Sequence, residues 1–234
     1  VPFVSKATGV PLAKIAVQIL LGKRLKELGL TQANAMSYCS VKEAVLPFSK
    51  FPGVDTLLSP EMKSTGEVMG IADNFGEAFY KAELGAGDTL PLHGTIFLSI
   101  NQRSKEELLS EMHLLYDAGY KLIATEGTAA YLNAHGIPCE RVYKVSEGRP
   151  NIVDVIKNKQ VDLIINTPTG KVPKEDAYTI RQAAVRYHVP IITTLAAAKA
   201  AVQGIVSMKK AGHFTVKSLQ EYHAEVKQCV KKRF

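Results

Sequence analysis

The sequence predicts an α/β protein built on a doubly wound, five-stranded parallel sheet. From residue 93 onward, short apolar segments alternate with segments of helical periodicity, as in repeated β-α units. The apolar segments contain few polar residues, which is typical of parallel strands that are buried on both faces. The residues before 88 lack this alternation. We therefore expect a smaller α+β part to precede the parallel sheet.

The first part of the chain is expected to contain two helices and one strand. Apolar residues recur at helical spacing over 12–28, and a second helix is predicted over 74–84. A short strand is predicted at 41–46, followed by a proline-punctuated loop. The polar, glycine-bearing segment 62–70 leads into the second helix, and residues 85–91 have the composition of a linker.

In the second part, strands and helices alternate. We expect strands at 95–100, 120–125, 141–145, 161–166 and 190–193. We expect helices at 108–115, 128–134, 152–158, 175–187 and 195–206. Ser104 and Glu107 have the spacing of a capping box at the start of the first of these helices.

Composition limits the class of protein. The 234 residues are 46% hydrophobic, enough for a sizeable core, and no apolar run approaches the roughly 20 residues that cross a bilayer. The net charge of +7 is dispersed, and no RNA-binding aromatic pattern accompanies it. We therefore predict neither a nucleic-acid nor a membrane partner. The chain begins at Val1 without an initiator Met, so we expect a piece of something longer.

The cysteines favour a reduced setting. Cys39, Cys139 and Cys229 are an odd number, lie far apart and lack metal-ligand spacing. We predict a cytoplasmic protein without a disulfide framework and without a metal site.

The most informative motif lies in residues 121–132. Thr125 ends a predicted strand, Gly127 allows a sharp turn, and Thr128 occupies a possible helix N-cap. The free N–H groups and positive dipole end of a helix start attract an anion, and two hydroxyls add donors. The alternative is that Thr128 only caps its helix.

Several polar residues lie at the carboxyl ends of the predicted strands. They are Ser99, Asn101, Thr125, Lys144, Asn166, Thr167 and Thr193. Ligands of open α/β sheets collect beyond the carboxyl ends of the strands, so together these residues predict an anionic ligand. Lys105 and Lys144 could neutralise a phosphate, or they could be ordinary surface lysines. Residues 166–170 offer groups for a base or sugar, or form an ordinary turn.

The sequence contains no convincing catalytic arrangement. Its six histidines are scattered, no Ser or Cys has a base at a diagnostic spacing, and no P-loop occurs. We predict no catalytic residue. Glu43 has apolar neighbours; its carboxylate could face water at a strand edge or hold an ammonium group.

The motifs resemble a known family, the carbamoyl phosphate synthetase large subunits. Residues 1–14, 46–53 and 61–70 resemble the end of the second ATP-grasp domain. Residues 93–208 resemble the C-terminal allosteric domain, which has the methylglyoxal-synthase-like fold. The matching stretches there are 124–128, 144–150 and 164–167. The resemblance implies an ATP-grasp tail with linker over 1–87 and a methylglyoxal-synthase-like allosteric domain with a C-terminal helix over 88–234.

The resemblance also implies ligands and residues. Effectors of the UMP or IMP type would bind the allosteric domain, and ornithine would bind at the junction of the two parts. The effector phosphate would contact Lys105, Thr125, Thr128 and Lys144. The rest of the nucleotide would contact Ser99, Ile152, Asn166, Thr167 and Asp176. Glu43 and Thr193 match the positions that hold ornithine. Pro168 and Ala177 depart from the bacterial pattern, which affects effector identity and affinity.

The complete family enzyme makes carbamoyl phosphate from bicarbonate, an ammonia source and two ATP, for pyrimidine and arginine synthesis. It uses ATP with Mg or Mn, and its partners are the rest of the large subunit and a glutaminase small subunit. The present residues contain no cofactor site of their own, and we expect them to be inactive alone. Two alternatives are a free-standing methylglyoxal synthase, although its Gly-Asp-Gln-Gln segment is missing here, and a nucleotide-binding interaction module.

Overall fold

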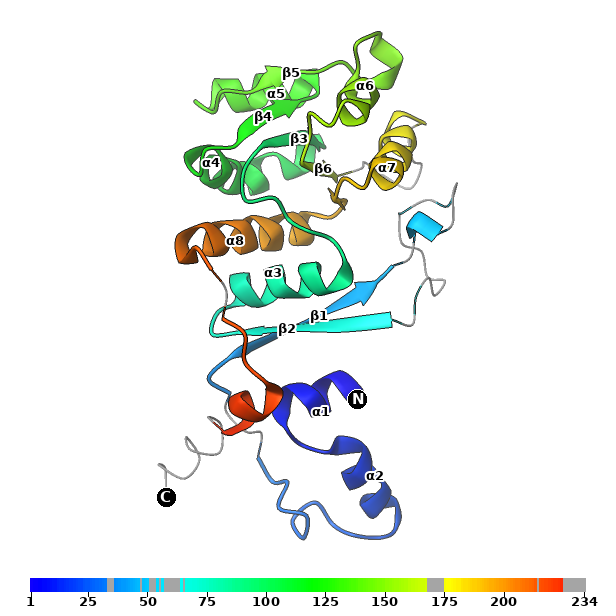
Figure 1. Ribbon diagram of the computed structural model, residues 1–234, viewed down its shortest axis with the longest axis vertical. Coiled ribbons are helices and arrows are strands. Elements are labelled where there is room, and N and C mark those ends of the chain that lie inside the picture. The colour runs from blue at the N-terminus through cyan, green and yellow to red at the C-terminus, as the bar shows by residue number, and fades with distance from the viewer. Residues whose placement is uncertain are drawn as a thin grey trace.

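The computed structural model describes residues 1–32, 36–46, 48–50, 54, 56, 64, 66–167, 175–213 and 215–224 (Figure 1). A five-stranded parallel sheet consists of β3 (Thr95–Ile100), β4 (Lys121–Ala124), β5 (Glu140–Arg141), β6 (Leu163–Thr167) and β7 (Ile191–Ile192). Their order is β5-β4-β3-β6-β7, so the winding reverses between β3 and β6. The predicted doubly wound parallel sheet is confirmed.

Five helices cover the sheet. They are α4 (Leu109–Asp117), α5 (Glu126–Ala134), α6 (Ile152–Lys157), α7 (Glu175–Tyr187) and α8 (Leu195–Ala211). Successive side chains of a strand point to opposite faces, and β3 divides the core accordingly. Ile96 and Leu98 pack with residues of α4, α5 and α8, whereas Phe97 packs with residues of α6 and α7.

A second, antiparallel sheet contains β1 (Cys39–Val45) and β2 (Gly66–Ala72). Helix α3 (Phe75–Ala86) lies between this sheet and α8, so the two sheets are separated by two helical layers (Figure 1). Asn74 caps α3 by accepting a hydrogen bond from Glu77 N–H at 2.9 Å.

The two ends of the described chain lie together beyond the antiparallel sheet. Helices α1 (Pro2–Thr8) and α2 (Leu12–Leu20) occupy this end, and a helical turn at 219–224 lies beside α1 (Figure 1). Four 3-10 helices complete the described elements: η1 (Phe48–Lys50), η2 (Gln102–Ser104), η3 (Glu106–Leu108) and η4 (Val145–Glu147).

Several predicted boundaries differ from the structure. The helix predicted over 12–28 ends at Leu20, because Gly22 adopts φ +94° and the chain continues as turns. Segment 62–70 contains the start of β2, which was not predicted because its glycines and polar residues weaken the strand pattern. The capping box predicted at Ser104 does not begin a long helix. Asn101 caps η2 instead, and α4 starts at Leu109.

Candidate functional site

A cavity of about 390 Å³ lies where the carboxyl ends of β3, β4 and β6 meet the first turns of α5 and α7. It is lined by Ser99, Ile100, Asn101, Lys105, Thr125, Gly127, Thr128, Lys144, Ser146, Glu147, Asn166, Thr167, Asp176, Ala177 and Ile180. This is the switch point of the sheet, the place where open α/β sheets bind ligands. All residues predicted to contact a nucleotide line the cavity except Ile152, which is fully buried in the core with Phe97.

The turn at Thr125 opens α5 with free backbone donors. Thr125 is the N-cap residue, and its side chain makes no capping hydrogen bond. The N–H groups of Glu126 and Gly127 donate to no acceptor among the described residues. A helix start with unused donors carries a partial positive charge that favours an anion.

The structure places Thr128 differently from the predicted N-cap position. It lies inside the first turn of α5, so the interpretation of Thr128 as an N-cap is wrong. Its hydroxyl accepts from Ile100 N–H at 3.2 Å and donates to Ile100 O at 3.3 Å. Thr128 therefore joins α5 to the end of β3 and supports the wall of the cavity.

Lys105 brings a buried cation to the same wall. Its side chain is 8% exposed, and Nζ donates to Gln102 Oε1 at 2.9 Å and to Gly127 O at 2.6 Å. Burial lowers the pKa of its ammonium group. No carboxylate within the described ranges forms an ion pair with it. A buried charge with only neutral partners is costly, and a bound anion would compensate it.

Lys144 lies at the rim and is partly compensated. Its Nζ is 3.5 Å from Glu147 Oε1, and Glu147 Oε2 accepts from the backbone N–H of Lys144 at 3.0 Å. Its side chain is about half exposed. Lys144 can therefore contribute charge to the cavity only from its edge, because solvent screens an exposed lysine.

The opposite wall presents amide and hydroxyl groups. Ser99 of β3 is in register with Asn166 of β6, directly at the switch point. Asn166 is 3% exposed, and its Nδ2 has no hydrogen-bond partner in the described part of the chain. The Thr167 hydroxyl accepts from Asn101 N–H at 3.1 Å and from Asn101 Nδ2 at 3.3 Å. Asn101 thus positions Thr167, while Asn166 retains a donor for a ligand.

Asp176 forms part of the cavity wall in the first turn of α7. Its Oδ2 accepts a hydrogen bond from Ser146 Oγ at 2.6 Å, which links α7 to η4. Ala177 also lines the cavity, whereas Pro168 lies outside the described residues. Sequence reasoning missed Ser146, because only the fold brings η4 and α7 together.

The second predicted site pairs Glu43 of the antiparallel sheet with Thr193, which follows the last strand of the parallel sheet. Glu43 is in β1, and burial, together with the charge of Asp88, raises its pKa. Thr193 follows β7 and precedes Thr194, the N-cap of α8. No hydrogen bond joins Glu43 to Thr193 in the described ranges. Glu83, which sequence reasoning missed, lies near Glu43, and burial followed by the charges of Glu43 and Asp88 raises its pKa to about 8.

Within the described residues, no group of three or more His, Cys, Asp or Glu side chains is placed to hold a metal ion. No single helix in those ranges is long and apolar enough to cross a membrane. Helices α1 and α2 meet that composition only as a pair bent by 114°.

Comparison with known proteins identifies the family to which this chain is related. Residues 107–193 match the model of the MGS-like domain. The carbamoyl phosphate synthase large chain of Methanosarcina mazei is 52% identical over 228 residues, or 97% of this chain and 21% of that protein. The large chain of Archaeoglobus fulgidus is 54% identical over 226 residues, 96% of this chain and 21% of that protein. This chain is a homologue of the C-terminal region of carbamoyl phosphate synthase large chains.

The predicted resemblance to carbamoyl phosphate synthase large chains is confirmed, and so is the MGS-like α/β fold. The chain spans about a fifth of the length of these two relatives. A methylglyoxal synthase structure from Elizabethkingia anophelis NUHP1 covers 48% of this chain and 79% of its own, at 22% identity. Its TM-score is 0.41, too low to add to the assignment.

Proposed function

We propose that this chain is the regulatory part of a carbamoyl phosphate synthase large chain and that its cavity binds the phosphate of a small effector. The observation that carries the proposal is Lys105, a buried cation with neutral partners beside the free N-terminal donors of α5. A phosphate would accept from the Lys105 ammonium, from the hydroxyl of Thr125 and from the helix N–H groups. Thr128 holds that wall in place, and Lys144 adds charge from the rim.

The rest of the effector would lie along β6 and α7. The unused Nδ2 of Asn166 supplies a donor to a base carbonyl or ring nitrogen, and Ser99 lies beside it in register. Asp176 is an acceptor and suits a sugar hydroxyl rather than a phosphate. This distribution of a cation at one wall and an acceptor at the other fits a nucleotide of the UMP or IMP type.

A second effector, ornithine, is proposed at Glu43 and Thr193. Glu43 and Glu83 would share an ammonium group, because burial raises the pKa of both carboxyls and the charge of Glu43 raises that of Glu83 further. A bound ammonium compensates these charges. Thr193 would contribute its hydroxyl from the start of α8.

The complete large chain would perform the chemistry. We propose ATP-dependent synthesis of carbamoyl phosphate with Mg or Mn, in the cytoplasm, together with a glutaminase small subunit and in support of pyrimidine and arginine synthesis. Effectors would shift the equilibrium between arrangements of the regulatory and ATP-binding parts, in proportion to their difference in affinity for each. We expect the 234-residue chain alone to be inactive.

Isothermal titration of the chain with UMP, IMP and ornithine tests the proposal. We expect saturable binding by at least one nucleotide, and the absence of binding by both UMP and IMP at millimolar concentration would overturn the phosphate cavity. The absence of ornithine binding would overturn the second site. A parallel assay with dihydroxyacetone phosphate distinguishes the alternative enzyme. Formation of methylglyoxal would indicate a free-standing synthase in place of a regulatory part.

A further inference from the structure

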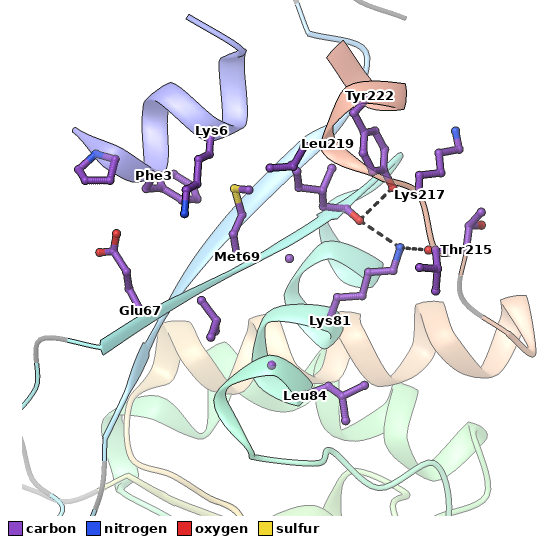
Figure 2. Close-up of a pocket in the computed structure, with 16 residues that line it drawn as sticks. Phe3, Lys6, Glu67, Met69, Lys81, Leu84, Thr215, Lys217, Leu219 and Tyr222 are labelled. Carbon is purple, nitrogen blue, oxygen red and sulfur yellow. Dashed lines mark hydrogen bonds between the residues drawn. The ribbon is translucent and has the colours of Figure 1, made fainter. Parts of the chain in front are cut away.

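The segment 215–224 runs from the end of α8 back to the first helix of the chain. Gly212 ends α8, and the segment then crosses α3 and β2 (Figure 1). Figure 2 shows its first anchor, where Lys81 Nζ donates to Thr215 O at 2.6 Å and to Ile71 O at 3.0 Å. Glu77 completes this anchor by accepting from Thr215 N–H at 3.3 Å and pairing with Lys81 at 2.9 Å.

The second anchor is Tyr222. Its hydroxyl donates to Ile71 O at 3.2 Å (Figure 2). Its ring lies 5.1 Å from that of Tyr38. Tyr38, Ile71 and Tyr222 form a small buried cluster of their own. The segment is therefore fixed to β2 both by a hydrogen bond and by apolar packing.

The third anchor reaches α1. His223 Nε2 is 2.7 Å from Lys6 O, and the Tyr38 hydroxyl donates to Ala7 O at 2.6 Å. The last carbonyls of a helix have no partner within the helix, so these two side chains satisfy the end of α1. Gly9, at φ +71°, lies so close to His223 that a Cβ there would be 3.0 Å from the imidazole ring.

Helix α1 has little else to hold it in place. Its only buried residue among those described is Ala7. A cavity of about 550 Å³ separates α1 from β2 and α3, with Phe3 on one side and Met69 and Leu84 on the other (Figure 2). The position of α1 thus depends on the hydrogen bonds at its end and on the segment that supplies His223.

At the opposite end from α1, packed helices connect the segment 215–224 to the phosphate cavity. Lys105 is the N-cap residue of η3, and η3 packs against α8. Helix α8 in turn packs closely on α3, where a Cβ on Gly76 would overlap Ser207 and lie 2.7 Å from Gln203 O. Closely packed interiors transmit displacement rather than absorb it. A shift of η3 would therefore reach α8 and the segment that continues from it.

We propose that residues 215–224 form a C-terminal latch that carries occupancy of the phosphate cavity to α1, with His223 as the connecting residue. The proposal rests on the proposed function, because it assigns the regulation of the same cavity. An anion on Lys105 repositions η3 and α8, and the C-terminal latch passes this change to the end of α1 through the His223 hydrogen bond. Effector binding therefore changes how firmly α1 is held in place.

Hydrogen exchange of the 234-residue chain, with and without saturating UMP or IMP, tests the C-terminal latch. In the unaltered chain, we expect the nucleotide to change exchange at α1. In His223→Ala, we expect exchange at α1 to rise about tenfold and its response to nucleotide to disappear, while the nucleotide Kd changes less than about twofold. His213→Ala is the matched control, because His213 is exposed and has no hydrogen-bond partner among the described residues.

The outcomes separate the two proposals. An α1 response that survives in His223→Ala, or that is missing when nucleotide is bound to the unaltered chain, would overturn the C-terminal latch and leave the proposed function standing. Tyr222→Phe, which removes one hydrogen bond but keeps the ring, should weaken the response without abolishing it. If no nucleotide binds while His223→Ala still loosens α1, the proposed function fails and the regulatory role fails with it.

Discussion

At the scale of single residues, each of the two candidate sites contains charged groups that are costly to bury. The charge is positive in the first site and negative in the second. Lys105 is a buried cation without a carboxylate partner in the described ranges. Glu43 and Glu83 are partly buried carboxyls whose pKa burial raises, and the charge of Glu43 adds to the shift of Glu83. Groups held at an energetic cost of this kind are concentrated at functional sites. The first site suits an anion and the second suits a cation.

Glu83 gives a prediction for the pH dependence of stability. Its pKa in the folded chain is about 8, against an ordinary 4.5, so the unfolded chain releases this proton first. Its contribution to stability is therefore fully present below pH 4.5 and is lost as the pH rises toward 8. Between pH 4.5 and pH 8, we expect the free energy of unfolding of Glu83→Gln to fall by about 1–2 kcal/mol less than that of the unaltered chain. The difference is small because Glu83 is partly exposed.

Urea denaturation between pH 4.5 and pH 8 measures this effect. The free energy of unfolding of Glu83→Gln should fall less with pH than that of the unaltered chain. Some decline should remain, because burial also raises the pKa of Glu43 and Asp88. Glu106→Gln, on an exposed side chain, is the control. Identical pH profiles for Glu83→Gln and the unaltered chain would refute the assignment.

At the scale of elements, α3 is the layer that joins the two sheets, and glycines set its distances. Gly70 of β2 faces α3 so closely that a Cβ would overlap the carbonyl oxygen of Ala78. On the other side of α3, Gly76 has no room for a Cβ against Ser207 and Gln203 of α8. Both contacts involve backbone atoms, which cannot move aside as the end of a side chain can.

Gly76→Ala is therefore expected to lower the free energy of unfolding by about 3 kcal/mol, because α3 and α8 must separate. Gly85→Ala in the same helix is the matched control. A Cβ there would lie 3.4 Å from Val68 Cβ, an ordinary contact, so we expect a change between zero and about 1 kcal/mol of stabilisation from helix propensity. Thermal and urea unfolding measure both. Equal effects of the two substitutions would contradict the close packing of α3 on α8.

Local sequence signals predicted the elements that depend on local order. The strand at 95–100 and the helix at 175–187 were predicted with the observed bounds, because apolar periodicity and flanking polar residues mark them clearly. Strand β2 was missed, since its pairing with β1 is distant in sequence and its glycines, needed for the approach of α3, weaken the strand pattern. The N-cap was predicted at Thr128 rather than at Thr125, because Thr125 was assigned to the end of the preceding strand.

The residues of the candidate cavity were predicted only in part. Strand-end position and family resemblance placed Asn166 and Thr125 correctly at its wall. The supporting contacts could not be predicted, because they join segments that are distant in sequence, such as Ser146 with Asp176 or Asn101 with Thr167.

At the scale of the whole molecule, the layers form a continuous path between two ends. The parallel sheet with its cavity lies at one end and α1 lies at the other, with α8, α3 and the antiparallel sheet between them (Figure 1). The chain returns along this path through the C-terminal latch, so both termini of the described chain lie at the end far from the cavity. This path connects a ligand bound at the parallel sheet to α1 and to any partner surface that contacts α1.

The most direct test of the account is calorimetric titration of UMP and IMP into Lys105→Met and into the unaltered chain. A charge-assisted hydrogen bond contributes about 1.5–3 kcal/mol, so Lys105→Met should weaken nucleotide binding by roughly 10- to 100-fold. The exposed Lys157→Met should bind as the unaltered chain does. Thermal unfolding of Lys105→Met should show little change in stability, because removing the buried cation offsets the loss of its hydrogen bonds to Gln102 and Gly127. Nucleotide binding that is equally tight in Lys105→Met and in the unaltered chain would contradict a phosphate site in this cavity.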